Sequence, residues 1–186
     1  MAQQPQFNEA KAAQAAALLL RLRGGRMHYL KLLKLLYIAD REAIRRWGVS
    51  VTMDHYVSMD HGPVPSNTYR LMVDDIAKPN WRRLISPPLG EYEVELVATE
   101  VYNDLLSRAE EALLNEVYAH WGSRSRWDIV EHVHTYSEWR NPRGSAVPIH
   151  LRDILLGVGF TEDDARAVQS ELGAEAAAER ALSEPL

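Results

Sequence analysis

The stretch MHYLKLLKLLYIADREAIRRW, residues 27–47, decides the fold of this chain. Its apolar residues cover nearly the whole circumference of a helix, and a helix that is apolar all round belongs in the middle of a core. The pattern becomes charged after Asp40, so we expect the helix to leave the core there and to end at Gly48. The predicted core residues of this helix are Leu32, Leu35 and Leu36.

Helical patterns continue on both sides of this stretch. Asn8 is a good N-cap for an alanine-rich helix, and Gly24 would end that helix because glycine adopts the left-handed conformation cheaply. Two serine or threonine residues are each followed three positions later by aspartate, which is the spacing of a capping box. We therefore expect further helices over residues 8–23, 101–121, 125–134, 150–156 and 161–182, the last with a frayed end.

Two segments alternate between apolar and polar residues, which is typical of strands. They are Val51–Met59 and Glu91–Val97, and they could pair in one small sheet. Between them, the two prolines of Gly62–Ser66 predict a rigid turn, because proline fixes the backbone. Ser66 would then cap a short helix that runs to about Ala77.

Together these patterns predict the fold class α+β, predominantly α-helical: a compact helical domain with a small antiparallel sheet or hairpin. No stretch of the sequence has the length and composition of a linker between domains. We therefore expect one domain over residues 1–160, with a C-terminal helix over residues 161–186 packed on the same domain.

Composition excludes several classes of protein. The 186 residues include no cysteine, so disulfides, thiolate catalysis and cysteine-based zinc sites are all excluded. No apolar segment is long enough to span a bilayer and no secretory signal is present, so we expect a cytoplasmic protein without a membrane partner. The net charge of −5 argues against a dedicated nucleic-acid binder, which would carry a basic excess.

The sequence also lacks recognisable catalytic machinery. There is no G-x-S-x-G nucleophile motif and no glycine-rich phosphate-binding loop. His132 and His134 are two positions apart, which would place them ~200° apart on a helix and prevent joint binding of one ion. For Asp40, a structural role at the core edge is favoured over a catalytic one. We expect no catalytic residue, no metal site and no cofactor.

Aromatic residues gather near residues 134–143, where Trp127, Tyr136 and Trp139 precede or flank Arg140. Tryptophan, tyrosine and arginine are the residue types that anchor protein interfaces. They are also common in cores, and for each residue taken alone the core interpretation is favoured.

The sequence contains two ordered signatures, KLLKLLYIAD at residues 31–40 and a second within DHYVSMDHGPVPSNTY at residues 54–69. Together they resemble the signatures of the Panacea, or SocA-like, family of bacterial antitoxins. A looser third signature is a histidine followed by a tryptophan, matched by His134 and Trp139. The sequence departs from the family pattern at Leu33, where glutamine is common, and at His61, where tyrosine is common.

The resemblance implies a mainly helical antitoxin that neutralises a toxin encoded by an adjacent gene. It would act by direct protein–protein binding or as an adaptor that delivers the toxin to a protease, with a protease or chaperone as a further partner. The predicted partner-binding residues are Tyr37, Asp40, Arg41, His61, Tyr69, Trp139 and Arg140. The residues assigned to the structural motif are Lys34, Leu35, Leu36, Gly62, Pro63, Val64 and Ser66.

Two other functions remain open from the sequence. One is a DNA-binding regulator of its own operon, against which the acidic pI of about 5.8 argues. The other is a hydrolase that would use Asp40, His61 or His134.

Overall fold

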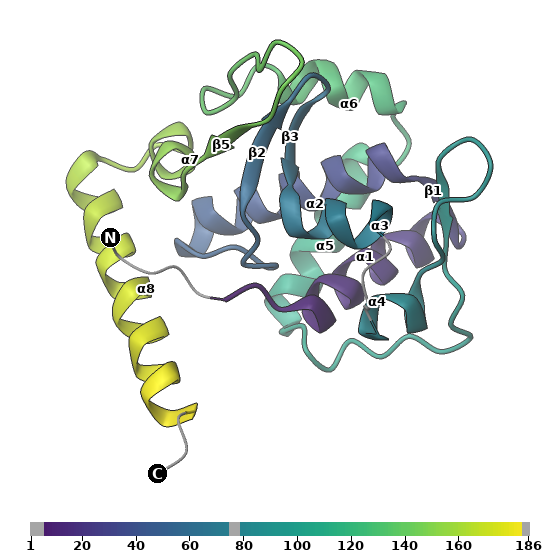
Figure 1. The fold of residues 1–186 in the computed structure, drawn as a ribbon, viewed down its shortest axis with the longest axis horizontal. Coiled ribbons are helices and arrows are strands. Elements are labelled where there is room, and N and C mark those ends of the chain that lie inside the picture. Colours follow the sequence, from purple (N-terminus) through teal and green to yellow (C-terminus); the bar gives the residue numbers. More distant parts are fainter. Residues whose placement is uncertain (1–5, 75–78, 184–186) are drawn as a thin grey trace.

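A computed structural model describes residues 6–74 and 79–183 of the chain. The fold is α+β and predominantly helical, as the sequence predicts, with short strands that form small antiparallel sheets (Figure 1). The elements in chain order are α1 Glu9–Arg23, β1 Arg26–His28, α2 Tyr29–Trp47, β2 Tyr56–Met59, β3 Gly62–Pro65, α3 Ser66–Val73, α4 Pro79–Leu84, β4 Glu93–Glu95, α5 Arg108–Trp121, α6 Arg126–Val133, β5 Val147–Ile149, α7 Leu151–Gly157 and α8 Glu162–Ser183.

Helix α2 is the centre of the molecule. Every residue from 31 to 40 is buried, and the helix packs against α1, α5, α6 and α7. The predicted core positions Leu32, Leu35 and Leu36 are each at most 1% exposed. The helix does not leave the core at Asp40, however, because Ile44 is also fully buried. Arg41 and Glu42 are partly exposed, and the exposed residues are the last three of the helix, 45–47.

Capping residues begin and end several helices where the sequence predicts. The Asn8 side chain accepts a hydrogen bond from the Lys11 N–H at 3.0 Å, and Gly24 ends α1 with a φ of 96°. Ser125 and Asp128 form a capping box at the start of α6. Helix α5 begins later than expected, because Ser107 forms its capping box with Glu110.

The strands do not pair as the sequence suggests. The predicted strands over residues 51–59 and 91–97 belong to different sheets. In one sheet β2 lies between β3 and β5, with Val57 opposite Val64 and Pro148. In the other, β4 pairs with β1, which directly precedes α2. Alternation predicts a strand but carries no information about its partner, which tertiary packing selects.

The prolines of Gly62–Ser66 lie in a strand at a sheet edge. Proline cannot donate a ladder hydrogen bond and is tolerated at edges, which fits the position of β3 outside β2. The prediction that Ser66 caps the next helix is wrong, because Pro65 is the N-cap and makes no side-chain bond. Asp54 caps α3 instead, with its carboxylate accepting the N–H groups of Asn67 and Thr68, each at 2.8 Å.

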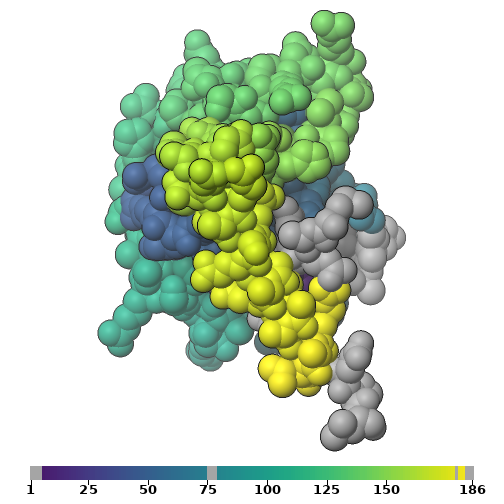
Figure 2. All heavy atoms as spheres, turned by 90° about the vertical axis from the view of Figure 1, so that its left-hand side faces the viewer, coloured from purple at the N-terminus to yellow at the C-terminus, as the bar shows by residue number. Residues whose placement is uncertain are grey.

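The long C-terminal helix α8 extends past the body of the molecule (Figures 1 and 2). Its first half packs on α7 and adds Ala165 to a small core cluster with Tyr56 and Ile154. The frayed C-terminal end that the sequence predicts falls on residues 184–186, which lie outside the described residues. The predicted end of α3 at Ala77 falls on residues 75–78, which also lie outside them. Within the described ranges, no helix is long and apolar enough to cross a membrane.

Candidate partner-binding site

The two family-like signatures meet around a hollow of about 250 Å³, which we call the Lys34 pocket. The first turns of α2 form its floor, the β2–β3 hairpin forms one wall, and α3 and the loop before β5 complete it. The lining residues are Tyr29, Leu30, Leu33, Lys34, Met59, Asp60, His61, Val64, Tyr69, Gly144 and Ser145.

Gly62 allows the hairpin to lie close to α2 and α6. Its φ of +92° is in the left-handed region, which favours glycine. A Cβ atom at this position would lie 2.6 Å from Val133 Cγ2 and 3.4 Å from both Lys34 Nζ and His134 Cδ2. Close packing at Gly62 and the two prolines both favour the rigid role predicted for this segment.

Five aromatic side chains lie at the pocket or next to it, in a group that we call the aromatic rim: Tyr29, His61, Tyr69, Tyr92 and Trp127. Tyr29, His61 and Tyr69 line the pocket, and the Tyr29 ring centroid lies 6.5 Å from that of Tyr69. Tyr92 and Trp127 each neighbour a lining residue, with centroids 5.8 Å from that of Tyr29 and 5.4 Å from that of His61, respectively. Tyr92 is 60% exposed and Trp127 is 51% exposed, so large apolar surface faces solvent at the rim.

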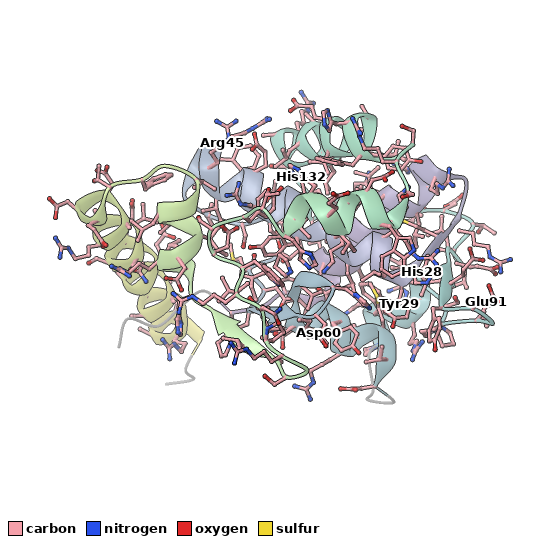
Figure 3. The ribbon with its side chains drawn as sticks, turned by 90° about the horizontal axis from the view of Figure 1, so that it is seen from above. His28, Tyr29, Arg45, Asp60, Glu91 and His132 are labelled. Carbon is pink, nitrogen blue, oxygen red and sulfur yellow. The ribbon has the colours of Figure 1, made fainter. Side chains whose placement is uncertain are left out.

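Tyr92 adopts a sparsely populated, left-handed backbone conformation, with a φ of 67°. A non-glycine residue with positive φ costs free energy that the surrounding structure must offset. Here the Tyr92 carbonyl accepts the N–H of Tyr29 at 2.9 Å, which ties the rim to the start of α2. Figure 3 shows His28 and Tyr29 next to the turn that carries Glu91.

Lys34 is fully buried at the floor of the pocket. Its Nζ donates a hydrogen bond to the Pro63 carbonyl at 2.8 Å. Burial disfavours the charged form and lowers the pKa of Lys34 to about 7. Burial and the charge of Lys34 also lower the pKa of His134, whose Nε2 is buried and has no hydrogen-bond partner among the described residues.

The third signature packs directly behind the pocket. The rings of His134 and Trp139 stack with centroids 4.1 Å apart, and Trp139 Nε1 donates to the Met59 carbonyl at 3.1 Å. The backbone N–H of Arg140 donates to Ser58 Oγ at 3.1 Å, and the Arg140 residue is exposed. Trp139 is half-buried, so it supports the hairpin and presents part of its surface.

Tyr37 and Asp40 cannot contact a partner in this fold, because both are fully buried. Asp40 accepts hydrogen bonds from the Thr52 N–H, the Thr52 hydroxyl and the Tyr56 hydroxyl. Burial raises the pKa of Asp40 to about 7, and the Thr52 and Tyr56 hydrogen bonds lower it in part. These two residues are therefore not kept among the proposed contact residues, and the structural role favoured for Asp40 fits its contacts.

Arg41 is engaged in a largely buried ion pair on another side of α2. Its Nε lies 2.7 Å from Glu138 Oε1, and its Nη2 donates to the Gly157 carbonyl at 3.0 Å. The Tyr37 hydroxyl donates to the same carboxylate at 2.9 Å. This network ties α2 to the segment after α6 and to α7, and Arg41 does not line the Lys34 pocket.

Of the predicted partner-binding residues, the structure brings His61 and Tyr69 together at the pocket and places Trp139 and Arg140 beside the same hairpin. Sequence reasoning missed Tyr29 and Tyr92 as members of one surface. It also assigned Lys34 only to the structural motif. The two tyrosines are 63 positions apart, and no local pattern links them, although the polar residue within an apolar helix marked Lys34 as unusual.

The residue types at the Lys34 pocket and its rim resemble those of protein-binding surfaces. The described residues include no group of three or more histidines or carboxylates that could hold a metal ion. The hollow is floored by apolar side chains and one buried lysine, and its rim carries the residue types that anchor interfaces.

Comparison with known proteins adds one family. Neither the search of curated proteins nor the search of solved structures gives a match. A family model described as "Antitoxin SocA-like, Panacea domain" matches residues 32–140, which is more than half of the chain and contains the second and third signatures and all of the first except Lys31. The chain therefore belongs to the SocA-like antitoxin family with the Panacea domain, and its role is related to toxin–antitoxin systems.

Proposed function

We propose that this protein is an antitoxin that neutralises the toxin encoded by an adjacent gene by binding it stoichiometrically through the aromatic rim. One observation carries the proposal: two exposed aromatic rings neighbour residues that line a hollow at the meeting point of the family signatures. Membership of the antitoxin family supplies the kind of partner. His61, Tyr69, Trp139 and Arg140 remain proposed contact residues, joined now by Tyr92 and Trp127.

The physical argument rests on the unequal distribution of binding energy across protein interfaces. A few tryptophan, tyrosine and arginine side chains near the centre contribute most of it. Tyr92 neighbours the lining residue Tyr29, Trp127 neighbours the lining residue His61, and both expose more than half of their surface in the isolated protein. A partner that covers both would bury this apolar area and would exclude water from the pocket.

The test is to co-express the protein with the product of the adjacent gene and to measure complex formation and protection of growth. Replacing either rim residue, Tyr92→Ala or Trp127→Ala, should weaken binding by at least about tenfold if it is a hot spot. The matched controls are Tyr102→Ala and Trp47→Ala, which remove aromatic rings of similar exposure elsewhere. Trp47 is a suitable control because it lies at the C-terminal end of α2, whereas the pocket residue Tyr29 lies at the N-terminal end.

The expected pattern is weak binding and lost protection for the two rim variants, with both controls close to the wild type. All four variants should keep the melting temperature of the wild type within a few degrees, because each removes an exposed side chain. If the controls lose binding and the rim variants keep it, the interface lies on another face.

Delivery of the toxin to a protease would add a step to the same binding event. A protease adaptor would shorten the half-life of the toxin in growing cells, whereas simple neutralisation would leave that half-life unchanged or longer. We propose simple neutralisation as the basic activity, and a pulse-chase measurement of the toxin with and without the antitoxin decides between the two.

A further inference from the structure

Lys34 is a buried lysine with no described acidic side chain paired with its Nζ. Lys34 is 0% exposed, and among the described residues its Nζ donates a hydrogen bond to the Pro63 carbonyl. An ammonium group carries three N–H donors, so this contact satisfies one of them. Buried charges are normally paired because removal from water is costly. The lysine therefore has a capacity for an anion that the fold itself does not use.

Lys31, one turn earlier, shows what a purely structural lysine looks like in this protein. It is also buried, but its Nζ donates to two carbonyls, those of Gly122 at 2.8 Å and Arg124 at 2.6 Å. These carbonyls follow the C-terminal end of α5, where a positive charge is favoured by the helix dipole. Lys34 has neither the second acceptor nor the helix end, and it lines a hollow instead.

The His134 ring and Lys34 Nζ both approach Gly62. A Cβ placed on Gly62 would lie 3.4 Å from both Lys34 Nζ and His134 Cδ2, so the two groups converge on one small region. His134 Nε2, which is bonded to this carbon, is buried without a partner among the described residues. The carboxylate that lines the pocket, Asp60, accepts the Gly144 N–H at 3.0 Å and makes no described ion pair with the lysine.

We propose that the Lys34 pocket receives the side-chain carboxylate of an aspartate or glutamate presented by the partner protein. The inference rests on the proposed function and names the chemistry of the residue that enters the pocket. Charge complementarity favours a carboxylate, since an unpaired ammonium group in a water-poor site binds an anion through strong charge-assisted hydrogen bonds. The volume of about 250 Å³ suits a single side chain, and the aromatic rim would pack around its entry.

Other hollows carry no comparable argument. The hollow between β2, β5 and α8 measures about 300 Å³ and is lined mostly by apolar residues such as Val57, Ile149 and Leu172. Nothing indicates what would occupy it. The hollow beside His132 contains Arg41 and Arg46, and both arginines are already paired with glutamates.

The first test uses small probes and the full chain. N-acetylglutamate α-amide carries a side-chain carboxylate, N-acetylglutamine α-amide is its neutral counterpart, and N-acetylalanine carries a free C-terminal carboxylate. NMR of the protein labelled at its lysine side chains would follow the Lys34 signals during titration with each probe. The glutamate probe should shift these signals and raise the apparent pKa of Lys34, and it should bind at least about tenfold more tightly than the glutamine probe.

Two variants localise the binding. Lys34→Met keeps the approximate volume of the side chain and removes the charge, so it should abolish binding of the glutamate probe. Lys31→Met is the matched control and should leave binding of the probe intact. Equal binding of the glutamate and glutamine probes to the wild type would overturn the inference without any variant. Tighter binding of N-acetylalanine would overturn it in favour of a chain terminus.

The second test uses the complex with the product of the adjacent gene. Lys34→Met should weaken the complex at least about tenfold, and one acidic residue of the partner, changed to its amide, should weaken it equally with no further loss in the double variant. A complex that forms equally well with Lys34→Met would overturn the carboxylate inference alone. If the wild type binds the glutamate probe but forms no complex, the proposed function is overturned and the carboxylate preference of the pocket stands.

Discussion

Lys34 has a pKa of about 7 in the folded protein against an ordinary value of 10.5. Between these two pH values the unfolded chain binds a proton that the folded chain does not, so the lysine makes stability rise with pH across that window. Below pH 7 both states are protonated and the full cost of burying the charge is present. We therefore expect wild-type stability, relative to Lys34→Met, to increase from pH 7 to pH 10 by up to about 1.4 kcal/mol per pH unit.

Urea unfolding of both proteins at several pH values measures this difference. The Lys31→Met variant, compared in the same way, is the control for the general loss of a buried lysine. The difference in unfolding free energy between the wild type and Lys34→Met could instead stay constant from pH 7 to pH 10. That result would mean that Lys34 keeps its proton in the folded state and has a counter-charge.

Asp40 gives the opposite sign in a lower window. Its pKa is raised from 3.8 to about 7, so between these values the folded state holds a proton that the unfolded state has lost. Stability due to this group therefore falls as pH rises from 4 to 7 and then levels off. Asp40→Asn keeps the shape of the side chain without the titration, so the wild type should lose stability relative to it over that window.

The same unfolding measurements at pH 4.5, 6 and 7.5 test the sign. Nearby Asp54 also has a raised pKa, but it is present in both proteins and its effect is largely removed in the difference. If the wild type instead gains stability relative to Asp40→Asn as pH rises, the carboxylate is ionised in the core and its hydrogen bonds dominate over burial.

At the scale of elements, the start of α3 depends on a residue outside the helix. The Asp54 carboxylate accepts the N–H groups of Asn67 and Thr68 and also the Thr68 hydroxyl at 2.7 Å. Asp54→Ala would leave these buried donors without an acceptor, so it should cost about 2 kcal/mol or more. Ser66→Ala should cost well under 1 kcal/mol, because the Ser66 side chain makes no capping bond.

Thermal and urea unfolding of the two alanine variants tests this assignment. A second readout is the Tyr69 signal in NMR spectra, because loosening α3 should also disturb this rim residue. Equal costs for Asp54→Ala and Ser66→Ala would restore the serine cap that the sequence suggests.

The whole molecule is unevenly anchored. Helix α2 is buried over residues 31–40, whereas α8 packs on α7 through its first half and is mostly exposed beyond it. Backbone amides open most readily where few apolar contacts hold them. We expect hydrogen exchange to be slowest in α2 and α5 and fast in the second half of α8, with protection differing by several orders of magnitude.

Native-state exchange followed by NMR or mass spectrometry measures this gradient. Complex formation with the partner should slow exchange around the β2–β3 hairpin and the Tyr92 turn while leaving the end of α8 unchanged. Strong protection of α8 in the free protein would show that this helix is an integral part of the domain core.

The sequence by itself determined the central position of α2, several helix caps and the membership of the family. Each of these features depends on short runs of neighbouring residues, so periodicity, spacing and local signatures reveal them. Only the tertiary structure decided the strand partners, the Asp54 cap and the burial of Ile44 beyond the expected helix exit. The Lys34 pocket also belongs to this second group, because Tyr29, His61, Tyr69 and Gly144 come from distant segments. Their meeting depends on how helices and strands pack, and no local pattern in the chain encodes that packing.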